Sequence, residues 1–130
     1  MSAAAKNIGI TSLGQVFINV HDLERATAFY RDVLALPLLF TAPNLAFFDC
    51  AGVRLMLGRA ETPEFDHPSS IIYYRVPEIQ RSYELLMSRG VHFEEKPALI
   101  ARLQDHDLWL ASFRDVDNNL LALMSEVPRV

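Results

Sequence analysis

Few side chains in this chain have both the chemistry and the position to act on a small molecule. Gln15, Arg54, Tyr73 and Arg75 lie in apolar segments where residues of two kinds alternate. An arginine that faces a cavity can bind a carboxylate, a phosphate or an enolate through paired hydrogen bonds. A tyrosine there can donate a hydrogen bond or exchange a proton. The sequence has no nucleophile motif and no glycine-rich phosphate loop.

Each of these side chains also has a structural interpretation. Arg54 could sit at a strand end and meet solvent or a nearby acid, and for this residue both interpretations stay open. For Arg75 the structural interpretation is favoured. For Tyr73 a place in a cavity wall without chemistry is favoured, because such tyrosines are the commoner kind.

The four histidines and the single cysteine do not form a convincing reactive set. His67 stands beside a proline in a segment without periodicity and is expected to face solvent. His106 lies between two aspartates before an apolar run, where ordinary turn chemistry is favoured, although its loop could overhang a cavity mouth as a gating or contact residue. His21 precedes a predicted helix, and His92 has no partner in the sequence. Cys50 lacks a cationic neighbour and is expected at a strand end in the core.

The elements that must position these residues follow from periodicity. Alternation predicts a strand over Gly14–Val20, with aliphatic side chains on one face and polar or aromatic ones on the other. A helix from Leu23 to about Leu36 follows, because Asp22 can cap its start and Pro37 ends it. Three short strands complete the first half, near Leu38–Thr41, Leu45–Cys50 and Val53–Gly58.

The second half repeats this order. A strand over Ser70–Val76 precedes a helix that Pro77 opens and Gly90 closes. Aligning Val20 with Val76 and Gly52 with Asn118 superimposes the two halves, which indicates an internal duplication of a β-α-β-β-β unit. The remaining strands are predicted at Val91–Glu95, Ala98–Leu103 and in a hairpin of Leu108–Phe113 with Leu120–Met124.

The duplication sets the domain organisation. Residues 1–12 form a flexible lead-in, and residues 13–126 form one domain. The domain consists of module 13–58, linker 59–69 and module 70–126. The predicted class is α+β, with curved mixed sheets that enclose a cavity and helices on the outer face.

The alternation also predicts which side chains face the cavity. A helix must cover the aliphatic face of each sheet, because that face cannot be left wet. The other face is mostly apolar with a few polar groups, which is typical of small-molecule pockets. Trp109 and Phe113 are expected under a helix, with Leu110 facing inward. The predicted ligand-binding residues are Gln15, Phe17, Asn19, Arg54, Met56, Ile71, Tyr73, Leu110, Ala122 and Met124.

Composition limits the partners. A net charge of −4 and a pI near 5.5 argue against nucleic acid or an anionic membrane, which require a basic face. The lone Cys50 excludes an intrachain disulfide and fits a reducing compartment. No apolar run reaches membrane-spanning length, and Met1–Ser12 has no signal-peptide core. These features predict a cytoplasmic protein that binds a small organic ligand, an anionic one if the arginines face it.

Two segments carry a family resemblance. The stretch NVHDLERATAFYRDVLALPL, the turn FRDVDNNLLAL and the duplicated unit resemble the vicinal oxygen chelate superfamily of glyoxalase I, bleomycin-resistance proteins and extradiol dioxygenases. The resemblance covers Leu13 to Glu126. Val116 and Asn118 stand where the family usually has proline and glycine, and Asn118 can still adopt a positive φ. The resemblance also implies a two-fold homodimer, which fits the exposed sheet edges expected of one chain.

Catalytic members of that superfamily hold a divalent metal with His, Gln or Glu from the first and fourth strands of each module. The matching positions in this chain are Gln15, Met56, Ile71 and Ala122. Only Gln15 is a plausible ligand, and Zn²⁺, Ni²⁺ or Fe²⁺ needs three or four. We therefore expect no metal and no cofactor. The favoured hypothesis is a metal-free binding protein of the bleomycin-resistance kind, and the alternative is a lyase, isomerase or dioxygenase whose ligands lie elsewhere.

Overall fold

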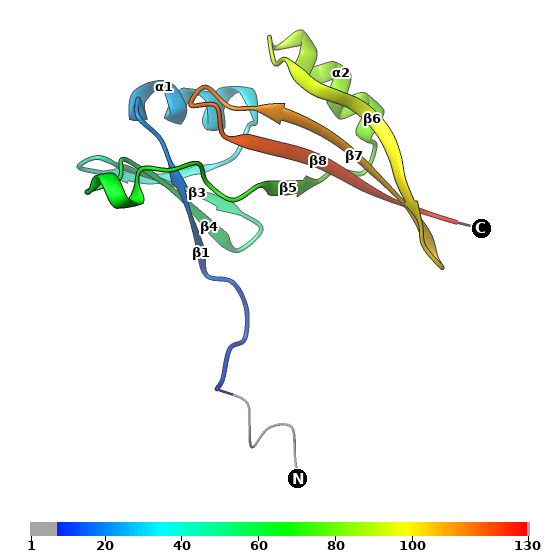
Figure 1. The fold of residues 1–130 in the computed structure, drawn as a ribbon, viewed down its shortest axis with the longest axis horizontal. Helices are drawn as coiled ribbons and strands as arrows, with labels where there is room; N and C mark the ends of the chain where they lie inside the picture. The colour runs from blue at the N-terminus through cyan, green and yellow to red at the C-terminus, as the bar shows by residue number, and fades with distance from the viewer. Residues whose placement is uncertain (1–7, 130) are drawn as a thin grey trace.

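Each half of the chain forms a four-stranded mixed sheet with one main helix packed on it (Figure 1). The computed structural model describes residues 8–129. The first module consists of β1 (Gln15–Asn19), α1 (Leu23–Ala28), η2 (Phe29–Val33), β2 (Leu38–Ala42), β3 (Leu45–Cys50) and β4 (Val53–Gly58). The second consists of β5 (Ile72–Arg75), α2 (Ile79–Ser88), β6 (Phe93–Arg102), β7 (His106–Arg114) and β8 (Leu120–Pro128), and the short turn η3 (Pro63–Phe65) lies between the modules.

The strand pairing confirms the predicted duplication. The first sheet has the order β1-β4-β3-β2 and the second has β5-β8-β7-β6, with the first and last strands of each module parallel. Both sheets are curved, they do not close on each other, and α1 and α2 lie on the same side of the molecule (Figure 1). The face of each sheet opposite its helix is called its open face below.

Helix-facing side chains lie as the alternation predicts. Ile18, Leu55 and Leu57 of the first module and Leu121 and Leu123 of the second are at most 4% exposed. Trp109 packs against the same core, and Phe113 is fully buried. One core therefore contains residues of both modules, and the register of the last hairpin is confirmed.

The tight turns explain where the hairpins reverse. Ala51 and Gly52 connect the paired residues Cys50 and Val53, and both have positive φ (49° and 93°), as a two-residue type I′ hairpin requires. Asn118 has φ 66°, so it supplies the left-handed conformation expected of it in the β7–β8 turn.

The first helix is shorter and less regular than predicted. It begins after Asp22, whose carboxylate accepts a hydrogen bond from the backbone N–H of Arg25 (3.1 Å). From Phe29 the chain continues as a π-helical segment that ends at Val33, not at about Leu36. There the N–H of Leu34 donates to the carbonyl of Phe29, five residues back. Sequence periodicity does not distinguish this widened turn from a regular α-helical one.

Two further predictions for the second module were wrong. The two strands expected around residues 91–103 form one strand, β6, whose pairing with β7 is interrupted by register shifts. His106 does not lie in a loop, because β7 begins there and His106 pairs with Pro128. Of the predicted lead-in 1–12, residues 1–7 lie outside the described residues, and residues 8–12 contain no helix or strand. No helix in the described part of the chain is long and apolar enough to cross a membrane.

Candidate functional site

The open face of the first sheet gathers five of the predicted ligand-binding residues. Parallel pairing of β1 with β4 places Gln15 beside Arg54 and Phe17 beside Met56. Asn19 follows on the same face of β1, opposite Gly58. Side chains two residues apart on a strand share a face, so these residues form one continuous surface.

Polar contacts fix one end of this surface. The Nε atom of Arg54 donates to the Oε1 atom of Gln15 at 3.0 Å, and the Nε2 atom of Gln15 lies 3.6 Å from the sulfur of Met56. The guanidinium of Arg54 also lies over the ring of Phe47, 5.5 Å from its centroid. Within residues 8–129 the two Nη atoms of Arg54 have no hydrogen-bond partner. They remain able to bind an anion in paired geometry.

Aromatic rings form the apolar part of the same surface. Phe47 stacks on Phe40 of the neighbouring strand with ring centroids 4.3 Å apart. Phe17 and Phe40 remain 39% and 48% exposed. Exposed rings held in a sheet offer a flat apolar surface to a ligand ring.

A hollow of about 450 Å³ lies at the other end of this surface. Of the predicted residues, Phe17, Asn19 and Met56 line it. The remaining wall comes mainly from the segment between the modules and consists of Leu45, Arg59, Ala60, Glu61, Phe65, His67, Ser69 and Ser70. The sequence pattern predicted only a linker here, because a segment without periodicity gives no sign that it forms the wall of a hollow. His67 is exposed as predicted, yet it lines the hollow.

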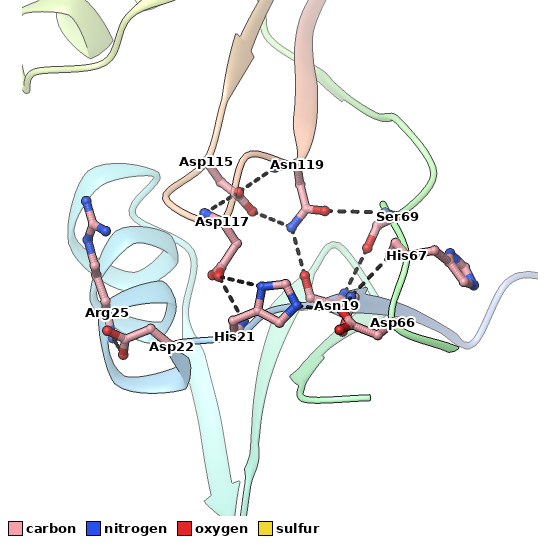
Figure 2. Close-up of polar contacts among 10 residues, drawn as sticks. All are labelled: Asn19, His21, Asp22, Arg25, Asp66, His67, Ser69, Asp115, Asp117 and Asn119. Atoms are coloured by element: carbon pink, nitrogen blue, oxygen red, sulfur yellow. Dashed lines mark hydrogen bonds and ion pairs between the residues drawn. The ribbon is translucent and has the colours of Figure 1, made fainter. Parts of the chain in front are cut away.

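Asn19 holds the linker against the sheet (Figure 2). Its Nδ2 atom donates to the Oδ1 atom of Asp66 (3.0 Å) and to the carbonyl of His67 (3.1 Å). Its backbone N–H donates to the hydroxyl of Ser69 (2.8 Å). Asn19 is only 7% exposed. These three hydrogen bonds mean that it holds the wall of the hollow in place in addition to lining it.

The second module fixes the same linker through its β7–β8 turn (Figure 2). Asn119 donates through Nδ2 to the carbonyl of Asn19 (2.9 Å), and the N–H of Ser69 donates to the Oδ1 atom of Asn119 (3.3 Å). The backbone N–H of His21 donates to the carboxylate of Asp117 (2.8 Å). Both modules therefore hold the wall in place.

His21 and Asp66 form an ion pair in this network when His21 is protonated. The Nε2 atom of His21 lies 2.6 Å from the Oδ1 atom of Asp66. This hydrogen bond and the charge of Asp66 raise the pKa of His21. The pKa of Asp66 is lowered, first by the hydrogen bond from Asn19 and then by the one from His21.

The other five predicted residues lie on the open face of the second sheet. Cross-strand pairing places Tyr73 beside Ala122 and Leu110 beside Met124. Ile71 and Tyr73 are 44% and 49% exposed, whereas Ala122 is buried. These residues do not line the hollow beside Phe17. Arg75, which shares this face, makes an ion pair with Glu126 (2.6 Å), the structural interpretation favoured for it.

The four positions that match the metal ligands of the resembled family do not fit a metal ion. The one oxygen donor, Oε1 of Gln15, already accepts from the cationic Arg54, whose charge would repel a second cation. Met56 offers a thioether, and Ile71 and Ala122 offer hydrocarbon. Among residues 8–129, no three His, Cys, Asp or Glu side chains form a group that could hold a metal ion.

Known proteins match both the sequence and the fold. The family model of the Glyoxalase/Bleomycin resistance protein/Dioxygenase superfamily matches residues 12–123. The uncharacterized protein YraH of Bacillus subtilis is 27% identical over 126 residues, which cover 84% of this chain and 94% of YraH.

Two solved structures with different described roles share the fold. TnmS3, an antibiotic-binding protein from a Streptomyces species, superimposes with a TM-score of 0.76 at 21% identity and covers 92% of this chain and 99% of its own. A lactoylglutathione lyase from Agrobacterium tumefaciens superimposes with a TM-score of 0.73 at 19% identity and covers 90% and 95%. At these identities the likeness concerns the fold alone.

Proposed function

Because this chain belongs to the glyoxalase/bleomycin resistance protein/dioxygenase superfamily, we propose that it binds a small organic ligand on the open face of its first sheet without a metal ion. The observation that carries this proposal is the pairing of Gln15 with Arg54 (3.0 Å). At the position that would hold the metal, an arginine occupies the only suitable oxygen. Binding of the bleomycin-resistance kind is therefore favoured over lyase or dioxygenase chemistry.

The surface around Arg54 suggests the chemical class of the ligand. Its guanidinium stands at one end of the stacked Phe40 and Phe47 rings, and Phe17 lies exposed beside Met56. A flat aromatic anion would place its ring on these side chains and its carboxylate on the Nη atoms of Arg54. The hollow under the linker would receive a substituent of the ring.

The same fold serves a protein described as antibiotic-binding, TnmS3, which supports retention of a ligand as the role of this chain. The lone cysteine supports a reducing, cytoplasmic location. The ten predicted residues remain the proposed contact surface, five on each sheet.

A second copy of the chain would complete that surface. Phe17, Phe40, Ile71 and Tyr73 leave large apolar areas exposed on the two open faces. We propose a two-fold dimer in which an open face of one copy covers an open face of the other. Sedimentation at micromolar concentration should give a dimer, and a monomer at every concentration would contradict this assembly.

Metal analysis and ligand titration test the proposed function together. Protein purified without chelators should contain no stoichiometric Ni, Zn, Fe or Mn, and calorimetry with a panel of aromatic carboxylates should reveal binding that Arg54→Gln weakens. Tightly bound metal that Gln15→Ala abolishes would overturn the proposal and favour a metalloenzyme. Binding of neutral and anionic aromatic compounds with equal affinity would contradict the role of Arg54.

A further inference from the structure

A second hollow, of about 720 Å³, lies between the two modules on the side of the helices. One wall belongs to the first module and includes Val33, Leu36 and the turn residues Cys50 and Ala51. The other wall belongs to β5 and α2 of the second module. This hollow is called the junction pocket below. Tyr73 and Met124 of the second sheet also line it, so it borders the contact surface proposed above, but it shares no residue with the first-sheet surface around Arg54.

The internal repeat explains why the junction pocket is empty of side chains. In the first module, Tyr30 is fully buried and its hydroxyl donates to Asp115 in the β7–β8 turn (2.8 Å). The alignment of Val20 with Val76 puts Leu86 at the position of Tyr30, and the alignment of Gly52 with Asn118 puts Asp49 at that of Asp115. Leucine is shorter and has no hydroxyl, so the equivalent contact is not made. The junction pocket lies at this place, between Leu86 and the β3–β4 turn.

The charges around the junction pocket have one sign. Its lining is mostly aliphatic, the charged members are Arg75 and Arg89, and none of the described residues that line it is acidic. Arg75 is paired with Glu126. Arg89 donates through one Nη atom to the carbonyl of Val33 (2.7 Å) and is otherwise exposed. Arg89 therefore has capacity to bind an anion next to an apolar wall.

One wall residue has an unused hydrogen-bond donor. The hydroxyl of Tyr74 is buried and has no partner among the residues that the structure describes. Burial, followed by the proximity of Cys50, raises the pKa of Tyr74, so the hydroxyl keeps its proton at neutral pH. Buried donors are nearly always paired in native proteins, so an acceptor from outside the chain would satisfy an unmet requirement here.

We propose that the junction pocket binds a small amphipathic carboxylate, with its hydrocarbon chain between the modules and its carboxylate on Arg89. The apolar walls select an aliphatic body. The unopposed charge of Arg89 selects an anionic head over a neutral or cationic one. Tyr74 can donate to an oxygen atom of the bound molecule.

Calorimetric titration with decanoate, decanol and decylamine tests the proposal, because the three probes share a chain and differ in the charge of the head. Decanoate should bind with one molecule per chain and at least about tenfold more tightly than decanol, and decylamine should bind most weakly. Equal binding of the three probes, or no binding of decanoate below its micelle concentration, would overturn the proposal.

Variants of α2 and of Arg89, the residue that caps its C-terminus, localise the binding. Arg89→Gln should weaken decanoate about tenfold and leave decanol unchanged, whereas Arg89→Lys should retain most of the affinity. Arg81→Gln, which removes a charge from the same helix outside the junction pocket, is the matched control. Leu85→Trp should block the pocket, because Leu85 lines it and is 47% exposed.

Two outcomes would show that the proposal is wrong even if decanoate binds. One is an equal loss of affinity in Arg89→Gln and Arg81→Gln, which would indicate non-specific attraction to a basic surface. The other is a dimer that Leu85→Trp dissociates, which would show that a second copy covers the junction pocket. Thermal unfolding of each variant confirms that a loss of binding is not a loss of fold.

Discussion

The imidazole of His21 and the carboxylate of Asp66 lie 2.6 Å apart, although 45 positions separate them in the sequence. Asp66 belongs to the linker that walls the hollow beside Phe17, and His21 belongs to the junction of β1 and α1. The strength of this contact therefore depends on the protonation of His21, which does not itself line the hollow.

The first prediction concerns the pH dependence of this contact. The pKa of His21 is raised above its ordinary value of 6.5, so its contribution to stability is fully present below 6.5 and is lost as the pH rises through the raised value. The pKa of Asp66 is lowered below 3.8, so its contribution is present above 3.8 and is lost as the pH falls through the lowered value. Asp117 supports the charge of His21 and Arg59 opposes it.

Urea unfolding of the wild type and His21→Gln measures this effect. The difference in their free energies of unfolding should be largest between the ordinary pKa values of 3.8 and 6.5 and should shrink as the pH rises through the raised pKa of His21. His92→Gln, an exchange at another exposed histidine, is the control for the loss of an imidazole elsewhere in the fold. If the wild type and His21→Gln differ in free energy of unfolding by the same amount at acidic and at alkaline pH, the ion pair is not the source of that difference.

The second prediction concerns the buried bond between Tyr30 and Asp115. Tyr30→Phe removes the donor and leaves a carboxylate that is 6% exposed with one bond fewer. Because Asn119 still donates to the same oxygen (3.0 Å), the free energy of unfolding should fall by about 1–3 kcal/mol and not further. Tyr83→Phe is the matched control, with an expected change of at most about 0.5 kcal/mol. Equal stability of Tyr30→Phe and the wild type in urea would show that the bond contributes nothing net.

The third prediction concerns the β3–β4 turn. Ala51 has φ 49°, a left-handed conformation that strains a side chain other than that of glycine or asparagine. Ala51→Asn should therefore raise the free energy of unfolding by about 0.5–1 kcal/mol, because asparagine is preferred at this place in a type I′ turn. Ala51→Val should lower it. Thermal unfolding of both variants checks the signs, and a less stable Ala51→Asn would contradict the assigned turn.

The fourth prediction concerns Gln15 and the proposed ligand surface. Gln15→Ala should change the free energy of unfolding by at most about 0.5 kcal/mol, because the side chain is exposed. It should weaken the binding of aromatic carboxylates, since Arg54 loses the acceptor that orients it. Arg31→Gln, which removes an arginine paired with Asp32 on the helix side, serves as the control in the same titrations. If Gln15→Ala binds aromatic carboxylates as tightly as the wild type does, Gln15 is not part of the ligand-binding surface.

Alternation in the sequence was enough to predict both modules and the helix-facing residues of β1, β4, β5 and β8. Ile18 and Leu57 are buried and Phe17 and Gln15 are exposed, as a period of two requires. The π-helical end of the first helix was not predictable, because its residues also fit an α-helical pattern.

The linker shows why part of the candidate site could not be predicted. Asp66, His67 and Ser69 are fixed by Asn19, which is 47 to 50 positions away, and no local pattern encodes such contacts. Asn19 itself looked like a polar residue facing a ligand, because alternation gives the direction of a side chain but not its partner. The junction pocket was not predicted for a related reason. It lies where Leu86 is too short to make the contact that Tyr30 makes with the β7–β8 turn in the first module.

The bonds from Tyr30 to Asp115 and from Asn119 to Asn19 join residues 85 and 100 positions apart. During synthesis the first module therefore leaves the ribosome with the hydroxyl of Tyr30 and the carbonyl of Asn19 still unpaired. Its core closes only after the β7–β8 turn has emerged, so the two halves are expected to fold as one late cooperative event. Until then, the nascent first half leaves exposed the apolar side chains that the second half covers in the complete fold.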